Sequence, residues 1–152
     1  HEIDWMTSIA GVPDTLFCRK MSVEHDDPRA NDHVWLTLGF GDEVTGTIEG
    51  SQMGTIADYY RGLMADEGSL FTRKWGNELF MQTSGKTEEQ VDGAEEFDKY
   101  GNCLDAIEGR APSVADVHWG RQVVAITERA LESAMTGRVV TVEPSLETPC
   151  ST

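Results

Sequence analysis

The stretch VWLTLGF at residues 34–40 has an apolar residue at every second position. A period of two is typical of a strand with one face in the core and the other face exposed. The residues Gly41-Asp42-Glu43 then predict a turn, and residues 44–51 are expected to return as the second arm of a hairpin. Antiparallel pairing is therefore expected near the centre of the sheet.

The segments around this hairpin extend the same pattern. Further strands are predicted at residues 15–23, 59–64, 69–75 and 78–83, with a charged loop at 84–92 and a short final strand at 139–142. The order is one helix, a run of strands and two more helices. This order indicates the α+β class rather than alternating βαβ units. We expect a mostly antiparallel, open-faced sheet of about six strands with helices packed on one face.

Three helices are predicted from apolar spacing. The first covers residues 1–10 and stops at Gly11 and Pro13, and the second covers residues 97–107 and ends at Gly109. The third is expected to open at residues 113–116, where the Ser113 oxygen would accept a backbone N–H, and to end at Gly137. Its predicted apolar stripe consists of Val117, Val124 and Leu131, widened by Val123, Thr127, Ala130 and Ala134.

The length and composition indicate one acidic globular domain. The chain has 152 residues, with 27 acidic and 12 basic side chains and a net charge of −15. Nucleic-acid binding needs Lys and Arg to neutralise phosphates, so no nucleic-acid partner is expected. No apolar run is long enough for a membrane span, so no membrane partner is expected either. We place the domain at residues 1–143 and a flexible tail at residues 144–152.

The cysteines predict no disulfide framework. Cys18, Cys103 and Cys150 are three in number and far apart, so they are interpreted as structural or incidental thiols. The chain begins with His1 inside a predicted helix, which indicates a piece of a longer polypeptide. A cytoplasmic location is the expectation for that polypeptide.

Three stretches, in this order, resemble a known family. The first is His1-Glu2-Ile3-Asp4-Trp5-Met6 with Gly11, and the second is the turn Ala65-Asp66-Glu67-Gly68-Ser69-Leu70. The third lies within residues 97–142 and includes Leu104-Asp105-Ala106-Ile107-Glu108-Gly109-Arg110 and Glu132-Ser133-Ala134-Met135-Thr136-Gly137-Arg138. Together they resemble the C-terminal domain of the glucose–fructose oxidoreductase / inositol dehydrogenase / MocA oxidoreductases.

The resemblance implies half of a two-domain NAD(P)-dependent enzyme. An N-terminal Rossmann domain, absent from this chain, would bind most of the NAD or NADP. This domain would shape the pocket for a sugar, polyol or cyclitol hydroxyl and would form a homodimer or homotetramer through its sheet face. By resemblance His1 is the catalytic acid/base, and a histidine suits that task because imidazole titrates near neutral pH. Asp4 is assigned to substrate binding, with a structural hydrogen bond as the alternative.

Several other sequence patterns are weaker candidates for a functional site. The segment Gly39-Phe40-Gly41-Asp42-Glu43-Val44 lacks the third glycine of a dinucleotide-binding loop and is interpreted as a turn. The residues His25, Asp26, Asp27, Asp32 and His33 form the most metal-like cluster, although their spacing is irregular and no metal is expected. The aromatic residues Trp35, Tyr59, Tyr60 and Trp75 could line a sugar site or pack in the sheet, and His118 is expected at a helix surface.

Two rival functions remain open. The domain could be a non-catalytic binding or assembly module that uses its open sheet face. It could also be a small stand-alone hydrolase or metalloenzyme using the His25–His33 loop, although no Gly-x-Ser-x-Gly nucleophile elbow is present. If the resemblance holds, the fragment alone is expected to be inactive.

Overall fold

A computed structural model describes residues 1–22, 32–52, 60–92 and 97–143, apart from the side chain of Trp75. The chain divides into two compact units, which are residues 1–53 with 105–152 and residues 54–104. Helices and antiparallel strands occur together, so the predicted α+β class is confirmed. The predicted tail at 144–152 and most of the loop at 25–33 lie outside the described residues.

The first unit is built on a four-stranded antiparallel sheet in the order β3-β2-β1-β8. The predicted hairpin forms its centre: its turn has Gly41 at a φ of 61°, and the Asp14 carboxylate accepts the Gly41 N–H at 2.6 Å. Only a residue that tolerates a left-handed backbone fits at Gly41. The turn comprises residues 41–43, as predicted, whereas Gly39 and Phe40 are the last two residues of β2. The strands are β1 (Thr15–Met21), β2 (His33–Phe40), β3 (Val44–Ser51) and β8 (Val140–Thr141).

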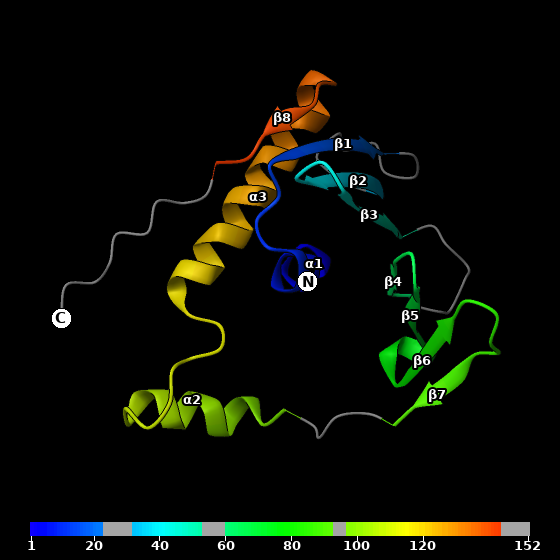
Figure 1. The fold of residues 1–152 in the computed structure, drawn as a ribbon. Helices are drawn as coiled ribbons and strands as arrows, with labels where there is room; N and C mark the ends of the chain where they lie inside the picture. The colour runs from blue at the N-terminus through cyan, green and yellow to red at the C-terminus, as the bar shows by residue number, and fades with distance from the viewer. Residues whose placement is uncertain (23–31, 53–59, 93–96, 144–152) are drawn as a thin grey trace. The chain divides into compact units, whose positions relative to one another are not determined.

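Two helices, α1 (Glu2–Ala10) and α3 (Val117–Thr136), cover one face of this sheet (Figure 1). The register pairs Leu16 with Leu38 and Leu36 with Ile48, which places apolar side chains on the covered face. Leu38 and Ile126 are fully buried there. The predicted arrangement of helices on one face and an open second face therefore holds for this unit. The core consists of Leu16, Cys18, Leu36, Leu38, Phe40, Ile126, Ala130 and Val142.

The face that α3 turns toward the sheet differs from the predicted stripe. Val117 and Val124 are 77% and 58% exposed, whereas the buried positions are Gln122, Ile126, Ala130 and Ser133. At 100° per residue Val117 and Val124 lie on the opposite side of the helix from these buried positions. Ala130 and Ala134, which widened the predicted stripe, do pack on the core.

The cap of α3 also differs from the prediction. The Asp116 carboxylate accepts the Trp119 N–H at 2.8 Å, so Asp116 is the N-cap. The Ser113 hydroxyl instead donates to the Ala115 carbonyl at 3.2 Å. The helix ends as predicted at Gly137, which has a left-handed φ of 66°.

The second unit contains another four-stranded antiparallel sheet, in the order β4-β5-β6-β7. At its turn the Ala65 N–H donates to the Gly68 carbonyl at 2.9 Å. A Cβ at Gly68 would come within 2.6 Å of the Gln82 carbonyl oxygen, so the packing of β5 on β6 requires a glycine. The strands are β4 (Gly62–Met64), β5 (Gly68–Arg73), β6 (Glu78–Thr83) and β7 (Glu89–Val91).

Several details correct the prediction in and near this sheet. The described residues form eight strands, four in each of two sheets, instead of about six strands in one sheet, and β8 is the short final strand that the sequence predicted. β7 falls within the predicted charged loop; Val91 pairs with Leu79 while its polar neighbours remain exposed. β5 stops at Arg73, and residues Lys74–Gly76 form the short 3₁₀ helix η1.

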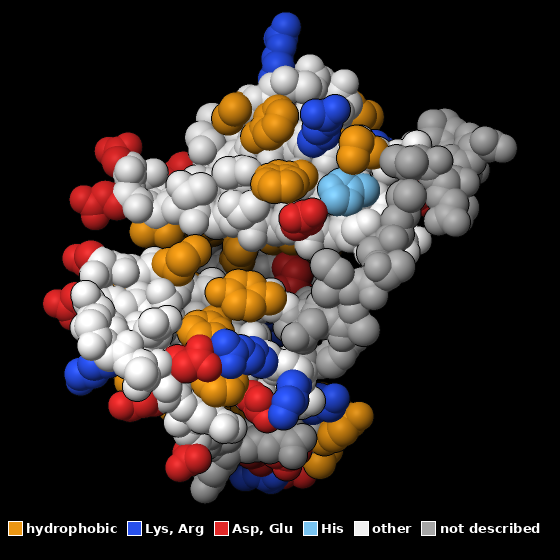
Figure 2. Space-filling view, turned by 90° about the vertical axis from the view of Figure 1, so that its right-hand side faces the viewer, with side chains coloured by type: hydrophobic (Ala, Val, Ile, Leu, Met, Phe, Trp, Pro, Cys, Tyr) orange, Lys and Arg blue, Asp and Glu red, His pale blue; other side chains and the backbone are white. Residues whose placement is uncertain are grey.

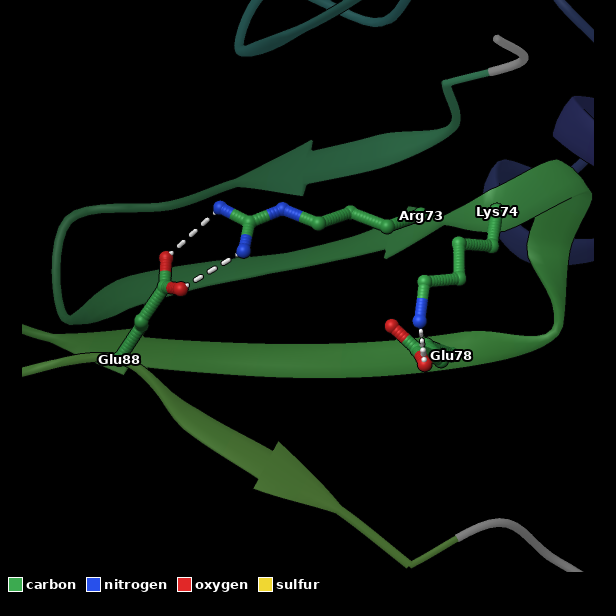
Figure 3. A network of polar contacts seen from close by, with 4 residues as sticks. All are labelled: Arg73, Lys74, Glu78 and Glu88. Carbon is green, nitrogen blue, oxygen red and sulfur yellow. Dashed lines mark hydrogen bonds and ion pairs between the residues drawn. The ribbon is translucent and has the colours of Figure 1, made fainter.

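Aromatic rings and ion pairs organise the second sheet. The ring of Phe71 stacks between those of Tyr60 and Phe80, at centroid distances of 6.2 and 5.8 Å. The Arg73 guanidinium lies over the Phe80 ring. Its two terminal nitrogens donate to the two carboxylate oxygens of Glu88 at 2.7 and 2.9 Å. Figure 3 shows this pair together with the ion pair between Lys74 and Glu78. Surface contacts of this kind each contribute little stability, so this sheet has weaker internal support than the first.

The helix α2 (Lys99–Ile107) follows this sheet and ends before Gly109, as predicted. Its N-terminal turn is tied by a hydrogen bond from the Gly101 N–H to the Asp98 carboxylate at 2.8 Å. The predicted apolar face is present but exposed, and it consists of Phe97, Tyr100, Leu104 and Ile107.

Candidate functional site

The candidate catalytic residue His1 lies at the exposed N-terminus of α1. Its carbonyl oxygen accepts the Trp5 N–H at 2.9 Å, so its backbone belongs to the first helical turn. Its side chain makes no capping hydrogen bond to the described helix. The imidazole is therefore exposed on a backbone that the helix holds in place.

Asp4, the predicted substrate-binding residue, is tied to the other helix of the unit. The indole N–H of Trp119 donates to the Asp4 carboxylate at 2.5 Å across a half-buried contact between α1 and α3. Hydrogen bonds to a charged acceptor are shorter and stronger than neutral ones. The structural hydrogen bond that the sequence offered as an alternative role for Asp4 is thus present.

Apolar contacts seat the rest of α1 on the sheet. Ile3 and Met6 pack against the core, and Thr7 is 1% exposed with its hydroxyl donating to the Ile3 carbonyl at 2.7 Å. The Met6 sulfur lies 2.8 Å from the position that a Cβ at Gly46 would occupy. A glycine in β3 therefore makes room for α1 to lie close to the sheet.

Two hollows on the described surface lie along α3. One is next to β8 and includes Arg129, Glu132 and Arg138; the hydrogen bond with Glu132, together with its charge, raises the pKa of the Arg129 guanidinium. The other lies beside Val117, Gly120 and Val124. Neither of these two hollows is lined by His1 or Asp4.

The metal-like cluster falls largely on residues outside the described part of the chain. Of its two described members, Asp32 is buried with its N–H donating to the Met21 carbonyl at 3.1 Å. His33 lies 3.9 Å from a Glu49 carboxylate oxygen on the sheet. Within residues 1–22, 32–52, 60–92 and 97–143, no three potential ligands cluster around a cation position.

The remaining candidates are scattered over the two units. Trp35 is exposed on the open face of the first sheet, Tyr60 belongs to the aromatic row of the second, and His118 is exposed in the first turn of α3. Tyr59 and the Trp75 side chain lie outside the description. The predicted aromatic site is therefore not assembled within either unit by the residues described.

The cysteines behave as predicted where they are described. Cys18 is buried and Cys103 is exposed, and both are free thiols. Burial raises the pKa of the Cys18 thiol, and the charge of Lys20 offsets part of this rise. A buried, protonated thiol is a poor nucleophile, so Cys18 belongs to the core rather than to a site.

Two residues whose roles the sequence did not reveal hold the unit together. Trp119 joins α3 to α1, as described above. Ser133 is fully buried: its hydroxyl oxygen accepts the Cys18 N–H at 2.9 Å, and the same hydroxyl donates to the Arg138 carbonyl at 2.5 Å. The Ser-x-x-x-Gly-Arg pattern around Ser133 was visible, but its partner in β1 lies 115 residues away and no local pattern could indicate it.

Comparison with known proteins supplies the class of fold. No protein-family model matches the chain, and no curated protein matches it in sequence. Solved structures do match. The WlbA dehydrogenase from Bordetella pertussis, in complex with NADH and UDP-GlcNAcA, has a TM-score of 0.76 at 12% identity over 95% of this chain. UDP-N-acetylglucosamine 3-dehydrogenase GnnA from Acidithiobacillus ferrooxidans has a TM-score of 0.75 at 15% identity over 90% of this chain.

A third match has the same character. An oxidoreductase from Agrobacterium radiobacter, in complex with NAD+, L-tartaric acid and magnesium, has a TM-score of 0.73 at 17% identity over 93% of this chain. The chain spans about half the length of these structures, covering 46%, 45% and 46% of the three in the order given. The chain therefore shares its fold with about half of each of these larger structures. This shared fold is the outcome expected from the sequence resemblance to the C-terminal domain of the glucose–fructose oxidoreductase / inositol dehydrogenase / MocA oxidoreductases.

None of the described helices is both long enough and apolar enough to cross a bilayer.

Proposed function

We propose that this domain forms the substrate side of an NAD(P)-dependent oxidoreductase that acts on a CH–OH group of a sugar, polyol or cyclitol. The supporting observation is the fold: over more than nine-tenths of its length this chain matches parts of a dehydrogenase and an oxidoreductase whose structures hold NADH and NAD+. The sugar-nucleotide names of two matched enzymes favour a sugar-like substrate.

Within this proposal His1 is the general acid/base. A neutral imidazole accepts the hydroxyl proton while the carbinol carbon is oxidised to a carbonyl, and it returns the proton in the reverse direction. The exposed position of His1 on a fixed helical backbone suits a group that must meet a substrate held partly by another domain. Asp4, one turn along the same helix, would orient a substrate hydroxyl through the carboxylate oxygen that Trp119 does not bind.

The nucleotide would be held mainly by an N-terminal domain. Among the described residues the nearest sequence to a phosphate-binding loop, Gly39-Phe40-Gly41-Asp42-Glu43-Val44, joins strand β2 to strand β3 rather than a strand to a helix. A bound nicotinamide would supply the hydride acceptor, and the part assigned to this chain is the proton and the substrate. The fragment alone is therefore expected to be inactive.

The test is hydride transfer by the full-length protein, followed at the absorbance of the reduced nicotinamide. We expect His1→Gln to lower kcat by about 10²-fold or more, the usual worth of a general base. Ser8→Ala is the matched control, because Ser8 is exposed on the same helix and its hydroxyl only donates to the Trp5 carbonyl. Wild-type turnover in His1→Gln would remove His1 from the mechanism.

We also propose that the open face of the first sheet pairs with a second copy of the chain to give a dimer or tetramer. Phe17, Met21 and Trp35 are 36%, 38% and 45% exposed on this face, where an uncovered apolar surface is costly. Trp35→Glu is expected to shift the full-length protein to a smaller species in light scattering. An unchanged mass would exclude this face as the main interface, and an assembly without turnover would favour the rival binding module.

A further inference from the structure

The contact between Asp4 and Trp119 is a directional polar link between α1 and α3. The helix α1 has nine residues, and the side chains described above as seating it on the sheet are mainly apolar. Apolar contacts resist separation but only weakly fix the rotation of a short helix about its axis. The hydrogen bond from the Trp119 indole to Asp4, 2.5 Å long, fixes that rotation.

Asp4 is well placed to transmit this constraint to His1. Residues three apart lie on one side of a helix, so Asp4 and His1 share a face of the first turn. The His1 carbonyl is bonded to the Trp5 N–H, so the two residues move as parts of one turn. A rotation of α1 that displaced Asp4 would therefore displace the His1 Cα as well.

The indole is itself anchored. The backbone N–H of Trp119 donates to the Asp116 carboxylate at 2.8 Å, which caps α3. The rest of α3 is fixed to the sheet by the fully buried Ile126 and Ser133. The link thus runs from the packed core of the unit, through the N-terminus of α3, to the first turn of α1.

From this arrangement we infer that Trp119 is the positioning residue of the active site: its indole N–H, through Asp4, sets the placement of the His1 imidazole. The inference rests on the proposed function, in which His1 moves the substrate proton. Proton transfer requires heavy atoms within about 3 Å, so a displacement of about 1 Å can cost up to about 10²-fold in rate.

The decisive experiment is a double-mutant cycle on kcat in the full-length protein. Trp119→Phe retains the ring and removes the N–H, and it is expected to lower kcat by about tenfold with little change in KM. In a His1→Ala background the same change is expected to have no further effect beyond about twofold, because a residue that acts through His1 cannot act without it. Thr127→Val, which removes an exposed hydroxyl bond to the Val123 carbonyl within α3, is the control expected to retain wild-type kcat.

The outcomes separate the two proposals. If Trp119→Phe lowers kcat by the same factor with and without His1, Trp119 acts by another route and this inference is wrong, while the role of His1 stands. If His1→Ala retains full activity, the proposed function itself fails. Wild-type kcat in Trp119→Phe also overturns the inference.

A second pair of variants covers the case in which Trp119→Phe does not fold. Asp4→Asn keeps an oxygen that can accept the indole N–H, whereas Asp4→Ala removes it. With His1 present, Asp4→Ala is expected to lower kcat by about tenfold or more and Asp4→Asn by less, and in a His1→Ala background Asp4→Ala is expected to change kcat by less than about twofold. A further tenfold loss in that double variant would contradict the link. The Trp119 indole proton resonance should move clearly more in Asp4→Ala than in Asp4→Asn.

Discussion

The two units of the chain are each built on a four-stranded antiparallel sheet, yet they differ in what covers it. In the first unit α1 and α3 lie on one face, and Leu38 and Ile126 are completely buried. In the second unit, residues 60–74, 76–92 and 97–104 include no side chain in the buried class. Leu63, Leu70 and Met81 of its sheet are 40%, 38% and 39% exposed.

This difference shows that strand pairing alone does not make a stable domain. A sheet becomes independently stable when a face is packed against helices or another sheet. The first unit contains that packing within itself. The second depends on its aromatic row and surface ion pairs, so it is the part with the most stability to gain from further packing in the proposed enzyme.

The largest expected effect compares one leucine from each sheet. Leu38→Ala should lower the free energy of unfolding by about 3–5 kcal/mol, because it leaves a cavity in a closed core. Leu70→Ala in β5 should cost less than about 1.5 kcal/mol, since that side chain is already 38% exposed. Urea unfolding of the two variants measures both values. Equal losses would mean that the second sheet is packed as tightly as the first.

The next effect concerns the hidden bond between α3 and β1. Ser133→Ala should cost about 1–3 kcal/mol, because the Cys18 N–H and the Arg138 carbonyl lose a buried partner. Thr136→Ala is the control: its exposed hydroxyl donates to the Glu132 carbonyl in the same helix, and its loss should change stability by less than about 0.5 kcal/mol. A Ser133→Ala variant as stable as the control would show that this bond does not tie helix to sheet.

A smaller effect is expected for the ion pair of the second sheet. Arg73 and Glu88 are 45% and 39% exposed, so a double-mutant cycle with Arg73→Met and Glu88→Gln should give a coupling of about 0.2–1 kcal/mol. Raising the salt concentration to about 1 M should shrink it, because exposed charges are screened. A salt-independent coupling well above this range would indicate that the pair is buried by packing not described for this unit.

The smallest effect is the titration of Cys18. Because burial raises the pKa of this thiol in the folded state, the stability it contributes is fully present below the ordinary thiol pKa and is lost as the pH rises through the higher folded value.

In a Cys150→Ser background, a thiol reagent should label Cys103 at once and Cys18 only upon unfolding. Equal labelling rates in the folded protein would show that the first core opens readily.

Local sequence patterns predicted much of the secondary structure of this fold but few of the contacts between segments that are distant in sequence. Alternation revealed β2 and β3, and the left-handed glycines Gly41, Gly109 and Gly137 marked where elements end. The packed face of α3 was only partly predicted, because the polar residues Gln122 and Ser133 are buried on it beside Ile126 and Ala130. β7 was missed because an edge strand of three residues carries mostly solvent-facing polar side chains.

The candidate site shows the same limit. His1 and Asp4 could be proposed because both lie in one short motif, and their roles remain predictions. The partner of Asp4 could not be predicted, because Trp119 lies 115 residues away and no sequence pattern around Trp119 indicates a contact with α1. Contacts between distant segments depend on the assembled fold, and a single sequence carries them only indirectly.

The central claim is that this chain is one half of a hydride-transfer site, with the nucleotide held by a second domain. The most direct measurement is a calorimetric titration of NADH and NADPH into the full-length protein and into residues 1–152 alone. The account predicts saturable binding of one of them, about one per chain, by the full-length protein and no measurable binding by the isolated residues. Tight stoichiometric binding by residues 1–152 alone, or none by the full-length protein, would contradict it.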